Sequence, residues 1–277
     1  MNEYNTSSSW IILNEIEYQI KRKIESIGTP LSNWNININR GIITGLNEAF
    51  IISEEIKNEL IEKDPKSAEI IRPIIRGKDI KKYQYNFANL WLINVHNGIK
   101  EKGVSPINIE LYPAVKEHLN QYYDKLVSRA DKGDTPYNLR NCVYMDDFFK
   151  PKIVYREIST NMNACMVEPG IMLNNKCYFI TGEHLSFLLA YFNSTIFNKI
   201  ILLQANATGG KGESFLHSIS AIKPSAELEE KIRGLLNKLY DTTNNLEKEK
   251  ILYDIDLVFY NLYGLSSEEV NYLSTII

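Results

Sequence analysis

Residues 41–50 read GIITGLNEAF, and residues 69–80 read EIIRPIIRGKDI. The short apolar run at residues 49–52 predicts a strand, and Ser53 is placed to cap a helix over residues 54–62. The two glycines of the first stretch are not spaced as G-x-G-x-x-G, so they predict turns rather than a dinucleotide-binding loop. Short strands, short helices and tight turns are therefore expected here.

Outward from this stretch, strands and helices continue to mix irregularly. Strands are predicted at residues 35–39, 90–95, 152–156 and 176–180, and helices at residues 16–27, 113–126, 182–192 and 194–204. No regular β-α alternation and no internal repeat is present in the sequence. The predicted class is α+β, with mixed, mainly antiparallel strands, interspersed helices and a helical segment at the C-terminus.

The C-terminal segment, residues 226–277, differs in composition from the rest. It holds 5 basic and 10 acidic residues, whereas residues 1–225 hold 26 basic and 24 acidic residues. Its leucines and isoleucines recur at helical spacing, and Ser266 with Glu269 forms a capping box that begins a final helix. The predicted parts are a connecting helix (residues 1–27), a main domain (28–225) and a helical segment (226–277).

Whole-chain composition is that of a globular protein. The 277 residues are 44% hydrophobic and 23% charged, with a net charge of −3. No apolar run approaches the roughly 18 residues of a membrane helix, and the N-terminus lacks the pattern of a secretion signal. A cytoplasmic location with no membrane partner is expected, and the three cysteines, lacking C-x-x-C spacing, are expected to be reduced thiols.

Motifs for catalysis or metal binding are missing from the sequence. Gly209-Gly210-Lys211 lacks the first glycine and the Ser or Thr of a phosphate-binding loop, and the four histidines are scattered without zinc spacing. Asp134-Thr135-Pro136-Tyr137 departs from the Asn-Pro-Pro-Tyr loop of amino-methyltransferases and is better explained as a turn. No catalytic residue, metal ligand or cofactor is predicted in this chain.

Two segments combine cations with tyrosines in the pattern of a nucleic-acid interface. One spans residues 72–85, and the other spans residues 125–156. Lys and Arg neutralise phosphates, Arg reads guanine, and Asn or Gln matches adenine in the major groove. The glycine-rich loop ATGGKGES, residues 207–214, suits phosphate or groove contact, and simple flexibility explains it equally well.

Taken in order, these motifs resemble the TaqI-like C-terminal specificity domain. The resemblance rests on GIITGLNEAF, on EIIRPIIRGKDI, on residues 113–126 with Arg129, on PKIV at 151–154, on LLAYFNSTIF at 188–197 and on the closing LYGLS at 262–266 with Glu268 and Glu269. It covers nearly the whole chain, and the order and spacing of its motifs make it specific.

The resemblance implies the target-recognition module of type IIG restriction-modification enzymes and adenine-specific DNA methyltransferases. In those proteins a methyltransferase domain, often with a nuclease, carries catalysis and would need S-adenosylmethionine and possibly Mg²⁺. We therefore expect this chain to be a fragment or a separately expressed domain whose partners are double-stranded DNA and such a catalytic domain.

DNA contacts are predicted in and between the motifs. The candidates are Thr44, Asn47, Arg76, Lys78, Arg129, Lys132, Tyr137, Arg140, Arg156, Asn161, Asn206 and Lys211. Motif residues such as Thr44, Asn47, Arg76 and Lys78 either touch DNA or stabilise the fold, whereas base-reading side chains should lie between motifs, in the loops at residues 129–141, 156–163 and 204–213.

Two other functions compete with DNA recognition. The acidic, amphipathic C-terminal segment also suits a protein-interaction scaffold or a detached specificity subunit in a phage-defence assembly. A self-sufficient nuclease or methyltransferase would need motifs that the sequence lacks. Residues 28–225 alone carry 23 basic and 20 acidic residues, which predicts a protein that binds DNA weakly by itself.

Overall fold

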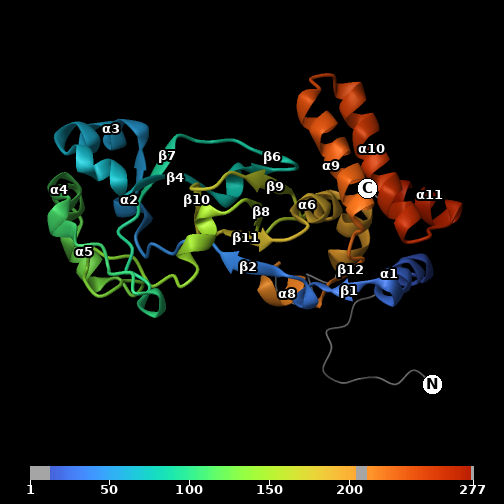
Figure 1. Cartoon of the computed structure of the whole chain (residues 1–277), viewed down its shortest axis with the longest axis horizontal. Helices are drawn as coiled ribbons and strands as arrows, with labels where there is room; N and C mark the ends of the chain where they lie inside the picture. The colour runs from blue at the N-terminus through green and yellow to red at the C-terminus, as the bar shows by residue number, and fades with distance from the viewer. Residues whose placement is uncertain (1–12, 204–210, 276–277) are drawn as a thin grey trace. The chain divides into compact units, whose positions relative to one another are not determined.

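The computed structural model describes residues 13–203 and 211–275 (Figure 1). Its α-helices are α1 (Glu15–Ile27), α2 (Asn47–Phe50), α3 (Glu54–Lys63), α4 (Pro113–Asn120), α5 (Tyr123–Ser128), α6 (Leu185–Asn193), α8 (Glu213–Ser218), α9 (Ala226–Asp241), α10 (Asn245–Leu262) and α11 (Ser267–Thr275). Its strands are β1 (Thr29–Pro30), β2 (Ile36–Arg40), β3 (Ile51–Ser53), β4 (Ile71–Ile75), β5 (Ile80–Lys81), β6 (Gln84–Tyr85), β7 (Leu90–Ile93), β8 (Lys152–Arg156), β9 (Ala164–Val167), β10 (Met172–Leu173), β11 (Cys177–Gly182) and β12 (Ser220–Ala221).

The strands form two four-stranded sheets and two short ribbons. The sheets have the orders β10-β4-β7-β3 and β2-β11-β8-β9, and the ribbons pair β1 with β12 and β5 with β6. In the first sheet, β7 is antiparallel to both β3 and β4, while β10 is parallel to β4. Both ribbons are antiparallel. The α+β class with mainly antiparallel strands is confirmed.

The chain divides into two compact units. Unit 1 comprises residues 1–38, 155–165 and 180–277, and unit 2 comprises residues 39–154 and 166–179. The predicted boundaries at residues 27 and 226 coincide with the end of α1 and the start of α9. The division into three consecutive domains stays a prediction. Each of the two units gathers segments that are distant in the sequence.

Unit 2 is built around the sheet β10-β4-β7-β3. Strands β4 and β7 bury Ile74, Ile75, Leu92 and Ile93 almost completely. Helix α3 packs on β3, β7 and α4 at the edge of this sheet (Figure 1).

Unit 1 has an aromatic core centred on Tyr191 in α6. Its ring lies 5.4 Å from Phe259 of α10 and 5.2 Å from Phe197, measured between centroids, and α9 packs on both α6 and α10. The Ser266–Glu269 capping box is present: the Glu269 amide donates to Ser266 Oγ at 3.2 Å, and the Ser266 amide donates to Glu269 Oε2 at 2.6 Å. The C-terminal helices are therefore part of the core of this unit.

Three predicted elements differ in detail. Ala49 and Phe50, predicted as strand, lie in the single turn of helix α2, and the strand β3 begins only at Ile51. The helix predicted at residues 113–126 is two helices, α4 and α5. The segment after Ser194 is a π-helix, η7 (Phe197–Ile201), within which the hydrogen-bond pattern is wider than in an α-helix.

Candidate functional site

The two glycine motifs meet in unit 2 at the turn between β10 and β11. The Gly41 amide donates to the Cys177 carbonyl at 2.9 Å, and the side-chain oxygen of Asn174 accepts from the Gly77 amide at 3.2 Å. A Cβ atom on Gly41 would lie 2.0 Å from the Asn174 carbonyl oxygen. Only glycine fits this close backbone approach, so Gly41 has a structural role in the motif.

The Arg76 guanidinium forms a bidentate pair within its own motif. Its Nε and one terminal nitrogen donate to the two Asp79 carboxylate oxygens at 2.8 and 2.9 Å. Burial works to raise the pKa of Asp79, but hydrogen bonds from Arg76 outweigh it and lower that pKa. The planar fork that would read guanine is therefore occupied by Asp79, while the neighbouring Lys78 side chain is exposed.

Arg129 is the centre of an internal clamp. Its side chain is 7% exposed and donates to the backbone carbonyls of Thr44, Asp131 (3.1 Å), Pro136 (3.0 Å) and Asn138 (2.5 Å). The guanidinium carbon lies 4.6 Å from the centre of the Phe50 ring, and burial lowers the pKa of Arg129 to about 10. Arg129 thus joins the first glycine motif to the loop at residues 129–141.

That loop presents polar side chains outward from the clamp. Lys132 and Arg140 are exposed, Arg140 pairs with Asp131 at 3.3 Å, and the Tyr137 hydroxyl donates to Asn120 at 2.6 Å. Asn47 is exposed and accepts a hydrogen bond from the buried Thr44 hydroxyl at 2.7 Å. Five predicted residues, Asn47, Thr44, Lys132, Tyr137 and Arg140, are therefore connected to one loop cluster around Arg129.

A hollow beside this cluster contains a cation, Arg40, that was not among the predicted contacts. It has a volume of about 320 Å³ and is lined by residues 40–43 and 140–144. Arg40 donates through Nε to the Asn175 carbonyl at 2.9 Å, and its guanidinium carbon lies 5.8 Å from the centre of the Tyr178 ring. The sequence feature that could have identified Arg40 as a candidate contact is its position directly before the glycine motif, at the end of β2.

In unit 1, Lys211 holds two loops together. Its Nζ, in a side chain only 2% exposed, donates to the Ser159 and Asn161 carbonyls at 3.0 and 2.8 Å and to the Ser159 hydroxyl. Burial, and secondarily the charge of Arg156, lowers the pKa of Lys211 to about 8. Arg156 and the Asn161 side chain are exposed. The predicted contact at Asn206 lies outside the described residues.

Other motif residues also hold loops. Lys152 of the PKIV motif is buried and donates to the carbonyls of Phe148 and Glu168, both at 2.8 Å, and burial lowers its pKa to about 8. Asn193 of the LLAYFNSTIF motif exchanges hydrogen bonds with the Ala164 backbone at 3.0 and 2.8 Å. The motifs therefore stabilise the scaffold from which the loops between them project.

Comparison with known sequences decides the family. The model of the TaqI-like C-terminal specificity domain matches residues 72–213, which is half of the chain. The chain belongs to this family. Among curated proteins, the specificity domain is 20% identical over 232 residues to the type II methyltransferase M.MjaIV of Methanocaldococcus jannaschii, covering 79% of this chain and 76% of that protein.

Two solved restriction enzymes resemble the specificity domain. The type IIL restriction-modification enzyme MmeI, solved in complex with DNA, matches 88% of this chain with a TM-score of 0.62 and 15% identity, which shows a shared fold. The type IIG restriction endonuclease BpuSI matches 92% of the chain with a TM-score of 0.48 and 12% identity. The specificity domain spans about a third of each of these solved chains, 35% and 34%.

The described part of the specificity domain contains no group of three or more His, Cys, Asp or Glu side chains arranged to hold a metal ion. No helix among these residues is long and apolar enough to cross a membrane. Whether each predicted candidate touches DNA stays a prediction, but the burial of Thr44, Arg129 and Lys211 and the internal pairing of Arg76 give those four side chains structural roles.

Proposed function

We propose that this chain is a sequence-specific double-stranded DNA recognition domain of a restriction-modification enzyme or adenine DNA methyltransferase. Membership in the specificity-domain family is the observation that carries the proposal. The arrangement of side chains supports it, because buried motif residues hold the scaffold, while exposed cations and amides lie on the loops between the motifs and at Asn47 and Lys78 within them. A domain that recognises a DNA sequence needs a rigid scaffold to position the side chains that contact the bases.

The exposed side chains are assigned the DNA contacts. Lys78, Lys132, Arg140 and Arg156 supply positive charge for phosphates or guanine edges, and Asn47 and Asn161 supply amides for base edges. Arg129 and Lys211 act indirectly by fixing the loops at residues 129–141 and 157–163. Arg40 joins the proposed contacts, because it lines the same hollow as Arg140.

The charge contacts are tested by salt dependence. Each phosphate neutralised contributes about −0.9 to the slope of log affinity against log salt concentration. Replacing Arg140 or Lys132 by Ala should reduce the steepness of this slope by roughly one. Lys231→Ala, in the exposed face of α9, is the matched control and should leave it unchanged. A slope that neither loop variant alters would refute the assigned contacts.

The proposal places methylation of adenine N6, and any DNA cleavage, in a catalytic partner outside this chain, together with S-adenosylmethionine and Mg²⁺. Large apolar side chains on the C-terminal helices support a partner surface: Tyr240, Leu246 and Tyr253 are 50%, 78% and 52% exposed.

This surface can be tested without removing the helices, which form the core of unit 1. Leu246→Glu should weaken association with a methyltransferase co-expressed from the same locus while leaving DNA affinity intact. Asn245→Glu, at the exposed neighbouring position in the same helix, adds the same single negative charge and is the control. Equal association of both variants and the native chain would refute the partner surface.

A further inference from the structure

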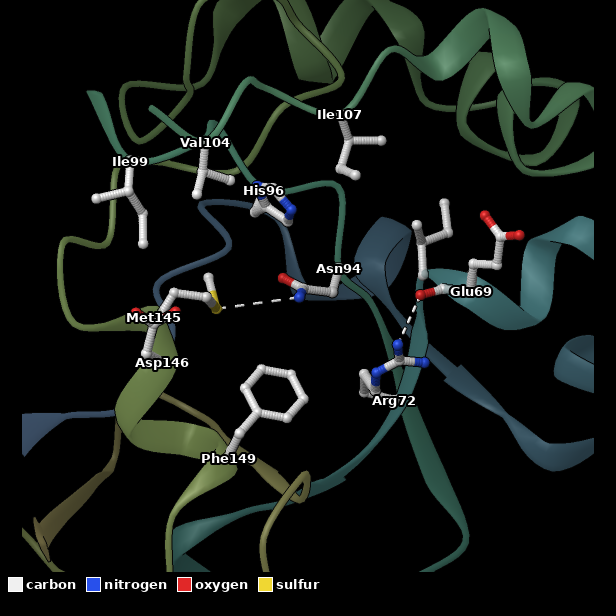
Figure 2. A pocket seen from close by; sticks show the side chains of 11 residues that line it. Glu69, Arg72, Asn94, His96, Ile99, Val104, Ile107, Met145, Asp146 and Phe149 are labelled. Atoms are coloured by element: carbon white, nitrogen blue, oxygen red, sulfur yellow. Dashed lines mark hydrogen bonds between the residues drawn. The ribbon is translucent and has the colours of Figure 1, made fainter. Parts of the chain in front are cut away.

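A cavity of about 190 Å³ lies in unit 2 beside the loop at residues 94–107 (Figure 2). It is lined by residues from the end of η2 (Pro65–Glu69), from β4, from the loop and from η6 (Met145–Phe149). Most of the lining is apolar, with Ile99, Val104 and Ile107 on the loop side and Met145 and Phe149 on η6. Such a lining with few polar groups is typical of a small-molecule site.

One buried polar atom in this cavity lacks a partner. Asn94, directly after β7, is 6% exposed, and its Oδ1 accepts no hydrogen bond from the described residues. Its Nδ2 makes only a weak contact of 4.0 Å with the Met145 sulfur, and Figure 2 shows the amide projecting into the space between the walls. An unpaired buried carbonyl oxygen is unfavourable, so a molecule bound in the cavity that donates a hydrogen bond to this oxygen would be stabilised.

His96 supplies a complementary donor. Its Nδ1 accepts a hydrogen bond from the Gly98 amide at 3.0 Å, which leaves the proton of the neutral ring on Nε2. Burial lowers the pKa of His96, so the ring is neutral at pH 7. The Nε2 hydrogen makes no hydrogen bond to another described residue. The cavity therefore offers one acceptor and one donor from residues two apart in the chain.

Each charged residue at the cavity has hydrogen-bond partners. The Arg72 guanidinium donates to the carbonyls of Ala68, Glu69 and Ile71 at 2.7–3.0 Å. The remaining two are carboxylates: Glu69 accepts from the Tyr112 hydroxyl at 3.0 Å, and Asp146 pairs with Lys102. Arg72 and Glu69 carry opposite formal charges and Lys102 offsets Asp146, so the charges at the cavity sum to zero and the ligand that fits is uncharged.

We propose that this cavity binds a flat, uncharged nitrogen ring that carries an amino group beside a ring nitrogen, as adenine and cytosine do. The amino group donates to Asn94 Oδ1, and the ring nitrogen accepts from His96 Nε2. The volume fits one such ring system, because a dry cavity of about 150 Å³ already holds benzene. The Phe149 ring, 48% exposed at the cavity, provides a face for stacking.

The cavity is tied to the loop that carries the predicted DNA contacts. Asn138 Nδ2 donates to the carbonyls of His96 (3.3 Å) and Ile107 (3.0 Å), and the Leu139 amide donates to the Val95 carbonyl at 2.8 Å. A ring in the cavity thus braces the backbone that positions Tyr137 and Arg140. This consequence rests on the proposed DNA-recognition function, whereas binding of the ring itself does not.

The ring has two possible sources, which separate experiments distinguish. For the free molecule, saturation-transfer NMR of the whole chain measures affinity for adenine and cytosine against hypoxanthine and uracil, whose keto groups replace the amino group. For a base in DNA, the fluorescence of 2-aminopurine is followed in a duplex that places it opposite an abasic site. Anisotropy of a fully paired duplex measures DNA binding independently.

The expected result is saturable binding in at least one arm, with the amino rings preferred over the keto rings. Asn94→Leu should weaken binding roughly threefold to tenfold, the range for loss of one neutral hydrogen bond. Val104→Trp should block binding by filling the cavity, and Asn58→Leu, on the exposed face of α3, should have no effect. Thermal unfolding confirms that each variant is folded.

Absence of binding in both arms, equal affinity for keto rings, or unchanged binding by both cavity variants would overturn the proposal. If the paired duplex binds while both ring probes fail, the cavity site is refuted and DNA recognition stands. If free adenine binds while no duplex does, DNA recognition is refuted and the cavity site stands.

Discussion

Replacing Arg129 by Met removes four hydrogen bonds to backbone carbonyls while keeping an aliphatic side chain of similar length over Phe50. A hydrogen bond from a charged donor contributes about 1.5–3 kcal/mol, but the four share one side chain and are not additive. The freed carbonyls also regain water as the loop at residues 129–141 opens. We therefore expect a loss of about 3–5 kcal/mol in the free energy of unfolding, and a lower midpoint of thermal unfolding by about 10 °C.

Thermal and urea unfolding of the purified chain measure this loss, and DNA affinity is measured well below the midpoint. Arg129→Lys keeps the positive charge but cannot reach four carbonyls, so it should lose most of the same stability. Arg140→Met removes an exposed ion pair at 3.3 Å and should change stability by less than about 0.5 kcal/mol while weakening DNA binding.

The reasoning would be refuted if Arg129→Met unfolded at the same temperature as the native chain and lost DNA affinity as Arg140→Met does. The guanidinium would then face DNA, as the sequence alone allowed, and would not clamp the loop. The Arg129→Lys variant sharpens this test, because retained charge with lost stability separates a geometric role from an electrostatic one.

Three further predictions concern buried lysines and glycines. Burial lowers the pKa of Lys152 in the folded chain to about 8, below the ordinary lysine value of 10.5. The unfolded chain therefore binds more protons between these pH values. The stability of the native chain relative to Lys152→Met should rise by about 2 kcal/mol from pH 7.5 to 9.5, as pH-dependent urea unfolding will show. A constant difference would contradict the burial of the charged amine. Gly41→Ala should destabilise the chain by about 1–3 kcal/mol because its Cβ meets backbone at 2.0 Å, whereas Gly234→Ala, in open space on α9, should stabilise it by about 0.5–1 kcal/mol; a thermal shift of the same sign for both would be inconsistent with this packing. Lys211→Met should lower DNA affinity without changing its salt slope, because Lys211 positions loops rather than contacting phosphate; a slope reduced by roughly one would assign it a phosphate contact.

Capping residues in the sequence predicted where helices begin. Ser53 accepts from the Ile56 amide at 3.4 Å, and Ser194 Oγ accepts from the Phe197 amide at 3.2 Å, as their positions before apolar runs indicated. The break between α4 and α5 was not predictable in this way, because neither Gln121 nor Tyr122 is a helix breaker. The sequence also gave no sign that strands and helices distant along the chain would form two compact units.

The structural roles of the buried cations could not be predicted from the sequence. Charge counting identifies Arg129, Lys152 and Lys211 as cations but cannot tell that backbone carbonyls from other segments surround each of them. Burial depends on which loops meet, and that information is distributed over the whole chain. The unpaired oxygen of Asn94 was invisible for the same reason, since the cavity around it is assembled from four separate segments.

Selection from a randomised pool of duplexes at moderate salt measures whether this chain reads a DNA sequence. One short motif should be enriched, with binding weakened steeply by added salt and lost when Arg140 and Lys132 are both replaced by Ala, while Lys231→Ala keeps it. A pool without any enriched motif would show that the chain does not read sequence, and an enriched motif that survives the double replacement would show that these two side chains do not hold the DNA.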